Sequence, residues 1–307
     1  MCGLAGVVFG ARPRRRGELE HLLGSFTKLL TLSQARGTDA TGAAIIREDG
    51  SVSVAKAPVP ATEFLRAFNR WLGRSLMTAT VPPVMLMGHT RYATRGTARQ
   101  NINNHPIVAG HVIGTHNGTI QNADDVFKAR SLLREAEVDS EVLFRLAEAH
   151  QNSEGDLDVE GWVKSLEDCL GNMAVVAVAL TDPQHVIFVR GGNPLFLAYS
   201  QRRDALLYAS EARFLTNVIA KEKDTWEVWE FPPDQAAVFD ARNLPEPHMI
   251  PFNYAGWWGF IPRANSRRGR ATVHPTEDGS GQDAPGDDLN AIGGLGDWAE
   301  DWWKLWE

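Results

Sequence analysis

Cysteine is scarce in this chain: 307 residues contain only two, Cys2 and Cys169. Two thiols exclude a disulfide framework and a zinc site of the cysteine-cluster type, because both need more of them. No apolar run approaches the length of about 18 residues that spans a bilayer, and the N-terminus lacks the basic-then-apolar order of a signal peptide. We therefore expect a soluble, cytoplasmic protein that binds no metal and no cofactor and does not contact a membrane.

Positive charge is also limited, since the formal net charge is −7 at pH 7. A surface for nucleic acid needs an excess of Lys and Arg, so the balance argues against that class of partner. One exception is the basic run at residues 12–16. Pro13 interrupts this run and acidic residues follow it, so we interpret it as a solvated turn.

Short apolar runs bounded by turn residues predict strands at 4–9, 42–46, 84–87, 107–113, 173–180, 185–189, 195–199 and 236–239. Apolar spacings of three and four predict helices at 19–30, 64–72 and 142–146. A further helical stripe at 162–170 places Cys169 inside as an inert thiol. Helices and strands in this mixture indicate an α+β fold.

The character of the chain changes near its end, and we place the limit of the folded domain (2–242) there. The extension, 243–307, contains a segment at 262–296 that is rich in Gly, Asp, Ser and Arg and predicts a flexible linker. Four tryptophans among acidic residues follow it: Trp298, Trp302, Trp303 and Trp306. Three of them share one side of a helix, which favours docking on a partner protein or packing on the chain's own domain.

The start of the chain offers a nucleophile. Once Met1 is removed, Cys2 carries a thiol and a free α-amine on one carbon. An α-amine titrates near about 7.7–8.0, so it can accept the thiol's proton at neutral pH. Gly3 leaves the backbone beside the thiol unobstructed, although it could equally be a plain structural glycine.

Further segments follow in a fixed order. They are Arg36 to Gly42, Gly88 to Gly96, Asn104-His105-Pro106, His116-Asn117-Gly118 and Asp139-Ser140-Glu141. With Cys2-Gly3 they resemble the glutaminase domain of class II glutamine amidotransferases, as in glucosamine-6-phosphate synthase and amidophosphoribosyltransferase. The resemblance runs from Cys2 to roughly Asp240. It implies a four-layer αββα sandwich of the N-terminal-nucleophile hydrolase type.

The resemblance also implies roles for single residues. Cys2 attacks the side-chain amide of glutamine, and the Asn117 side chain and the Gly118 N–H form the oxyanion hole. Taken alone, Asn-Gly would predict a hairpin turn. Arg91 would bind the carboxylate of glutamine and Asp139 its ammonium, with Tyr92 beside the site. Asp139 has an alternative use as an N-cap, and the two uses can coexist.

The remaining motif residues receive supporting roles. A cysteine that uses its own amine needs no histidine base, so we interpret His89, His105 and His116 as structural hydrogen-bonding residues. Arg36 and Asp39 belong to a loop that supports the nucleophile. Where glucosamine-6-phosphate synthase has histidine, this chain has Arg95, which leaves the subfamily open.

These patterns predict a stand-alone glutaminase that hydrolyses the amide of glutamine and supplies ammonia to a separate synthase, because the extension is too short for an acceptor domain. One alternative is a hydrolase of another γ-glutamyl amide. Activity on glutamine against other γ-glutamyl amides would distinguish the two. The second alternative is a non-catalytic binding or assembly protein that retains the fold, against which the complete set of site residues argues.

Overall fold

The computed structural model describes residues 1–254 and 271–273. The strands of one sheet are β1 (Gly3–Phe9), β2 (Ala40–Arg47), β3 (Val52–Ala57), β4 (Pro83–Arg91), β9 (Phe196–Ser200), β10 (Ala205–Ala209), β11 (Trp226–Glu230) and β14 (Ala271–Val273). Those of the other are β5 (Ile107–Ala109), β6 (Val112–Ile120), β7 (Gly171–Ala179), β8 (His185–Gly191), β12 (Gln235–Asp240) and β13 (Pro247–Pro251). The helices are α1 (Arg16–Ser33), α2 (Ala61–Met77), α3 (Ala123–Ala129), α4 (Glu141–Ala149), α5 (Val159–Ser165) and α6 (Ala212–Ile219).

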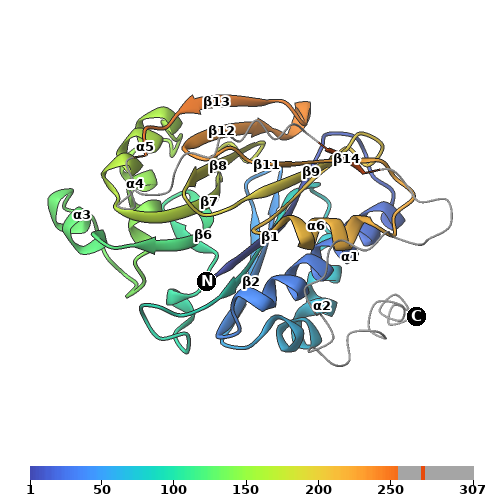
Figure 1. Ribbon diagram of the computed structural model, residues 1–307, viewed down its shortest axis with the longest axis horizontal. Coiled ribbons are helices and arrows are strands. Elements are labelled where there is room, and N and C mark those ends of the chain that lie inside the picture. The colour runs from blue at the N-terminus through green and yellow to red at the C-terminus, as the bar shows by residue number, and fades with distance from the viewer. Residues whose placement is uncertain (255–270, 274–307) are drawn as a thin grey trace.

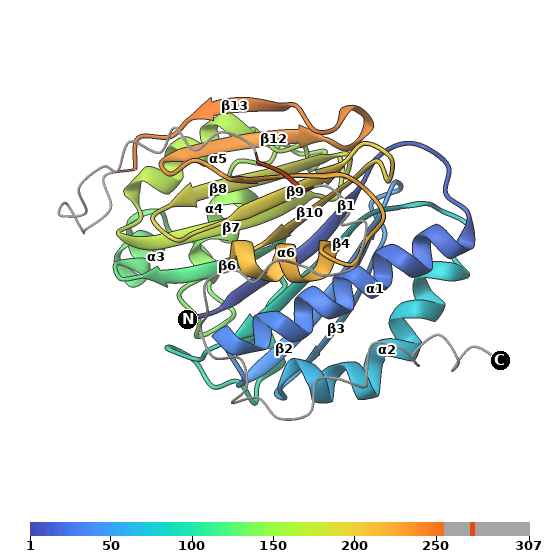
Figure 2. The same cartoon turned by 45° about the vertical axis from the view of Figure 1, so that its right-hand side comes forward.

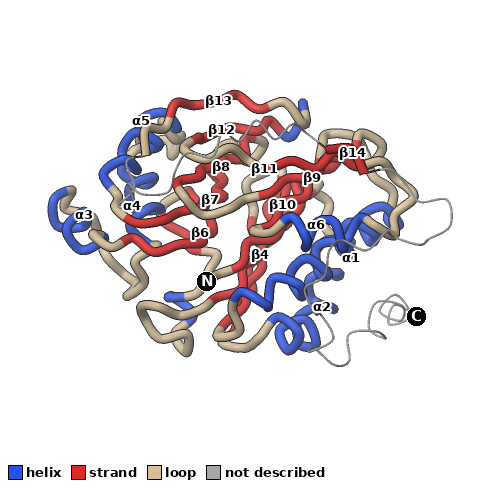
Figure 3. The backbone as a smooth tube through the Cα atoms, in the orientation of Figure 1, coloured by secondary structure: helices blue, strands red, loops and turns tan. Residues whose placement is uncertain are grey.

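The two sheets lie face to face at the centre, with helices on their outer sides (Figure 1, Figure 3). In the described residues the first sheet has the order β14-β11-β9-β10-β1-β4-β2-β3, and the second has β13-β12-β8-β7-β6-β5. All strand pairs within them are antiparallel. This arrangement is the four-layer αββα sandwich that the sequence resemblance implies.

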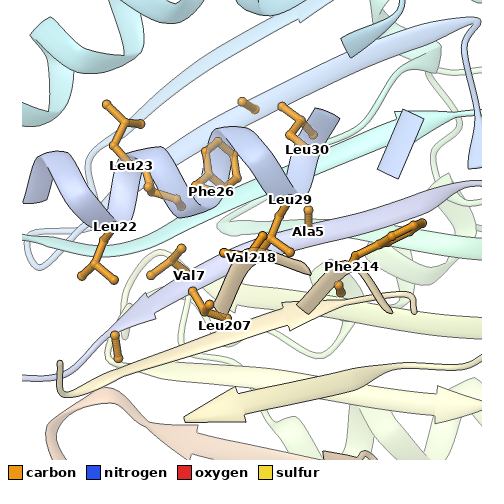
Figure 4. Packing of buried hydrophobic residues seen from close by; sticks show 14 of the residues in the cluster. Ala5, Val7, Leu22, Leu23, Phe26, Leu29, Leu30, Leu207, Phe214 and Val218 are labelled. Carbon is orange, nitrogen blue, oxygen red and sulfur yellow. The ribbon is translucent and has the colours of Figure 1, made fainter. Parts of the chain in front are cut away.

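One helical layer, formed by α1, α2 and α6, covers the first sheet (Figure 2). The apolar residues of α1 recur every three or four positions, so Leu22, Phe26 and Leu29 lie in one buried cluster with Val7 and Leu207 of the sheet (Figure 4). Each such side chain contributes about 1.5–3 kcal/mol when it leaves water. The apolar spacing in the sequence therefore fixes which side of α1 is buried.

The other helical layer covers the second sheet through α3, α4 and α5. Trp162 is fully buried there, and its indole Nε1 donates to the Leu143 carbonyl at 2.9 Å. Cys169 is buried as predicted, and burial raises the pKa of its thiol to about 12. The predicted helix at 162–170 is too long, however, because α5 ends at Ser165 and Leu170 is 40% exposed.

The space between the sheets holds a third apolar cluster, and strand alternation decides what faces it. Met87 of β4 and Ile113 of β6 both lie in this cluster. Side chains two positions apart share one side of a strand, so Arg91 lies on the inner side of β4 and Asn117 on the inner side of β6. The two sheets thus present these polar side chains to each other.

The predicted strand at 107–113 is wrong as a single element. The structure divides it into β5 and the start of β6, with a turn at Gly110, whose φ of +53° favours glycine. Gly110 lies inside the apolar run and is the sign of this turn in the sequence.

The folded part reaches past residue 242, the predicted end of the domain. Strand β13 pairs with β12, and Ala271–Val273, inside the predicted linker, pairs with β11. Such short edge strands carry too few apolar residues to show in the sequence pattern. The four tryptophans after residue 297 lie outside the described residues.

The basic run at 12–16 is not wholly a solvated turn. The side chain of Arg14 is only 6% exposed: its guanidinium donates to the carbonyls of Gly10, Arg203 and Asp204 and lies 5.3 Å from the centre of the Phe9 ring. Burial lowers the pKa of Arg14 to about 10. This arginine ties the loop after β1 to the turn between β9 and β10.

Among residues 1–254 and 271–273, no helix has the length and apolar character needed to cross a bilayer.

Candidate active site

Cys2 lies immediately before β1, half-buried, against the end of β4. Its Sγ accepts from the backbone N–H of Tyr92 at 3.4 Å and donates to the Tyr92 carbonyl at 3.6 Å. The Tyr92 side chain itself is 55% exposed. Tyr92 therefore holds the thiol through its backbone, a role that its aromatic ring could not have indicated in the sequence.

The backbone carbonyl of Cys2 is held by Arg36, which in turn pairs with Glu211. Arg36 Nε donates to the Cys2 carbonyl at 2.7 Å, and its Nη1 lies 2.8 Å from Glu211 Oε1. Asp39 Oδ2 accepts from the Ala93 N–H at 2.7 Å. The supporting roles expected for Arg36 and Asp39 are confirmed. Glu211 was missed, because a single carboxylate after a strand gives no signal of its own.

The pKa of the Cys2 thiol is raised, chiefly because burial disfavours the thiolate. The Tyr92 N–H, the amino terminus and Arg91 oppose this, whereas the charge of Asp139 adds to it. A thiol with a raised pKa is protonated at neutral pH. The nucleophile at this position consequently needs a group that takes its proton.

Arg91, the last residue of β4, is buried and firmly held. Its Nη1 donates to Asn104 Oδ1 at 2.8 Å, and its Nη2 donates to the carbonyls of Gly96, at 2.8 Å, and Arg95. Burial lowers the pKa of Arg91, although Cys2 and Asp139 act in the opposite direction. These acceptors fix the plane of the guanidinium beside the thiol.

Asp139 is also buried, and its Oδ2 accepts from the backbone N–H of Ile120, in β6, at 2.6 Å. The N-cap of α4 is Ser140, so the alternative use of Asp139 as an N-cap is not what the structure shows. The charge of Asp139 raises the pKa of the Cys2 thiol, and the charge of Arg91 lowers it. The structure thus brings a cation and an anion together near the thiol.

Asn117 lies in β6 and is fully buried, yet neither polar atom of its side-chain amide has a hydrogen-bond partner among the described residues. An unpaired buried amide costs about 1–3 kcal/mol. Gly118 follows with φ of +155°, and a Cβ there would lie 1.8 Å from the Asn172 carbonyl oxygen, so only glycine fits. The pair is part of a strand and not the hairpin turn that Asn-Gly predicts alone. Its free amide is suited to a ligand oxygen.

Three buried histidines surround this region. His89 Nε2 lies 3.0 Å from the His116 carbonyl, and His116 Nδ1 lies 2.8 Å from Ser140 Oγ, as expected of structural residues. His105 departs from that expectation: it stacks on His89 at 4.2 Å, and neither of its ring nitrogens has a partner among the described residues. Burial lowers the pKa of all three, that of His89 to about 3, so they are neutral at pH 7.

An open hollow of about 410 Å³ adjoins the residues that hold Arg91. It is lined by Arg95, Gly96, Arg134, Glu135, Ala136 and Glu137. Arg95 binds both carboxylate oxygens of Asp124, at 2.7 and 2.8 Å, and so ties this loop to α3. Within the described residues, no group of three or more His, Cys, Asp or Glu side chains could hold a metal ion.

Sequence comparisons match the chain to larger enzymes. The glutamine–fructose-6-phosphate aminotransferase (isomerizing) of Aliivibrio fischeri is 27% identical in an alignment of 248 positions that covers 79% of this chain and 37% of that protein. The protein of the same name from Leifsonia xyli is 28% identical in an alignment of 319 positions that covers 94% of this chain and 47% of the relative. The chain thus spans less than half the length of these curated relatives. No protein-family model matches it.

Solved structures agree on the fold. Glutamine phosphoribosylpyrophosphate amidotransferase from B. subtilis matches with a TM-score of 0.57 and 19% identity, over 82% of this chain and 49% of that one. A structure described as the allosteric regulatory enzyme of purine biosynthesis matches with a TM-score of 0.56 over 78% of this chain. The structural matches show that this chain shares its αββα sandwich with these amidotransferases, and Cys2 lies just before the first strand. Together with the sequence matches, they support a domain of the class II glutamine amidotransferase type.

Proposed function

We propose that this chain hydrolyses the side-chain amide of glutamine through Cys2. The observation that carries this proposal is the fully buried Asn117 amide, which has no partner among the described residues and lies on the inner face of the sheet opposite Cys2 and Arg91. A structural asparagine in that place would satisfy its own hydrogen bonds. An amide kept free suits an oxygen that becomes negative during the reaction.

The reaction begins with removal of Met1, which frees the α-amine of Cys2. That amine takes the thiol's proton, and the thiolate forms a C–S bond to the amide carbon of glutamine. Asn117 Nδ2 and the Gly118 N–H donate to the resulting oxyanion. The ammonium returns its proton to the amide nitrogen, the C–N bond breaks, and ammonia leaves behind a thioester. Water then cleaves the C–S bond, which gives glutamate and restores Cys2.

Arg91 and Asp139 bind the far end of glutamine in this proposal. Arginine has five N–H donors, so the guanidinium of Arg91 keeps donors for a carboxylate beside the bonds that fix its plane. Asp139 uses Oδ2 for the Ile120 N–H, which leaves Oδ1 for an ammonium. The Tyr92 ring, exposed beside Cys2, covers the outer side of the substrate.

The ammonia is delivered to a synthase on another chain or segment. Relatives that match this chain carry names of enzymes that transfer nitrogen from glutamine, and the match covers less than half of their length. The segment with Trp298, Trp302, Trp303 and Trp306 is the proposed contact with that partner. The protein that co-purifies with the full chain would identify the molecule that accepts the ammonia.

The proposal is tested with glutamine and with a chromogenic γ-glutamyl anilide as substrates, measuring glutamate release. Cys2→Ala is expected to abolish turnover. Cys169→Ala is the matched control: it removes the other thiol, which is buried far along the chain after α5, and leaves turnover close to that of the wild type. Preference for glutamine supports an amidotransferase; turnover of the anilide alone supports the γ-glutamyl hydrolase. Turnover that persists in Cys2→Ala contradicts both.

A further inference from the structure

The turn after β8 places an asparagine against the site. Asn193 is half-buried, and its Nδ2 donates to the backbone carbonyl of Asn117 at 2.8 Å. The two residues are 76 positions apart in the chain, so the contact joins separate parts of the second sheet. Asn193 does not stand out in the sequence, because Gly-Gly-Asn-Pro is ordinary turn sequence.

The carbonyl that accepts this hydrogen bond belongs to the peptide group that also contains the Gly118 N–H. The carbonyl of Asn117 and the N–H of Gly118 are the two ends of one planar unit, so whatever orients the first also orients the second. A hydrogen bond to a peptide carbonyl also polarises the unit and makes its N–H a better donor. Asn193 therefore acts on the Gly118 N–H without touching it.

The turn that carries Asn193 is tightly constrained. Gly192 has φ of +101°, and a Cβ on it would lie 2.7 Å from Asn172 Oδ1. A Cβ on Gly191 would lie 2.7 Å from the Tyr254 ring, whose hydroxyl donates to the carbonyl of Gly171. A rigid turn holds a side chain with little loss of rotamer freedom. The hydrogen bond to Asn117 is thus built in before any ligand binds.

We propose that Asn193 is a positioning residue that aims and strengthens the Gly118 N–H as a donor to the reacting oxygen. This inference rests on the proposed function, in which that N–H stabilises the oxyanion. Asn193 itself does not contact the substrate. Its loss lowers kcat and leaves KM unchanged, because the peptide group matters most when negative charge develops.

The first test reads the peptide group directly and needs no activity. Asn117-Gly118 is the only Asn-Gly pair in the sequence. Labelling asparagine with ¹³C at the carbonyl and glycine with ¹⁵N therefore gives one cross-peak in an HNCO spectrum of the full chain. Asn193→Ala is expected to move both the Asn117 carbonyl and the Gly118 amide resonances. Asn122→Ala removes a comparable bond from the side chain to the Asp168 carbonyl, at 2.8 Å, together with the bond that Asn122 Oδ1 accepts from the Leu170 N–H, at 2.7 Å, and leaves both resonances in place.

The second test measures glutamine turnover by the same variants. Asn193→Ala is expected to lower kcat roughly 10-fold, as loss of one neutral hydrogen bond would. Asn193→Asp keeps the shape but sets a carboxylate against the carbonyl, and a loss of roughly 100-fold is expected. KM stays within about twofold in both, and Asn122→Ala keeps the wild-type kcat.

The outcomes separate the two proposals. A cross-peak that does not move in Asn193→Ala overturns the role of Asn193, whatever the enzyme does. A moved cross-peak with unchanged kcat overturns its part in catalysis. If the wild type turns over no γ-glutamyl amide, the proposed function fails, and the cross-peak alone decides whether Asn193 positions the Gly118 peptide.

Discussion

Replacing Asn117 with leucine should make the protein more stable and nearly inactive. Asn117→Leu keeps the approximate shape of the side chain and removes its amide. In the structure that amide is fully buried, and neither of its polar atoms has a partner among the described residues. The native side chain therefore carries a cost that the leucine side chain does not.

The two effects have different sizes. A buried polar group without a partner costs about 1–3 kcal/mol, so the free energy of unfolding should rise by about 1–2 kcal/mol once some misfit of leucine is allowed for. Loss of one oxyanion donor costs about 3 kcal/mol in the transition state, or a roughly 100-fold to 1000-fold lower kcat. KM should change little, because the amide acts on the charge that develops later.

The assay pairs urea unfolding with glutaminase kinetics, and Asn103→Leu is the matched control. Asn103 is equally buried, but its Nδ2 donates to the Thr97 carbonyl at 3.1 Å and its Oδ1 accepts from the Glu137 N–H at 2.8 Å. Asn103→Leu should lose about 2 kcal/mol or more of stability. If Asn117→Leu is destabilised to the same degree as Asn103→Leu, the Asn117 amide is satisfied in the folded protein and the reasoning fails.

Three further predictions follow from the site and the extension. Arg91→Lys keeps the charge but cannot contact all three acceptors and a carboxylate, so KM for glutamine should rise roughly 10-fold or more, and an unchanged KM refutes the assignment. Burial lowers the pKa values of His89, His105 and His116, so below about pH 6.5 these side chains bind protons in the unfolded chain but stay neutral in the folded chain. Between pH 7 and pH 5 the free energy of unfolding, measured with urea, should therefore fall by about 2 kcal/mol through His89 alone. A free energy of unfolding that does not change with pH contradicts neutral histidines. Deleting residues 291–307 should leave the melting temperature and glutaminase activity unchanged while the partner is lost, and a large fall in melting temperature would instead assign the segment to the core.

Much of the fold was predictable because its signal is local. The apolar spacing of α1 and the β-branched runs of β7 and β8 each show their period within one element. Of the strands that were missed, β3 has only Ala55 buried, whereas β10 is apolar and buried along its whole length. They form because a neighbouring strand offers an edge, and no feature of their own sequence reveals that neighbour.

The site was predictable only where a motif carried it. Arg36, Asp39 and His116 have the supporting contacts that the sequence resemblance suggested. Asn193 and Glu211 could not have been found that way. Asn193 contacts a backbone carbonyl and Glu211 contacts an arginine, and in both cases the folding of the sheets brings the partner close. Such contacts depend on the register of the strands, which the pattern of the sequence does not determine.

Cys2, with its own amine free, is the proposed nucleophile, and every step of the proposed reaction depends on it. The most direct measurement is intact-mass and peptide-mass spectrometry of active protein treated with a glutamine-mimicking electrophile. We expect a chain that begins at Cys2 and carries one adduct, on Cys2, with no label on Cys169 and no remaining turnover. An active chain that keeps Met1, or an adduct elsewhere that abolishes turnover, would contradict it.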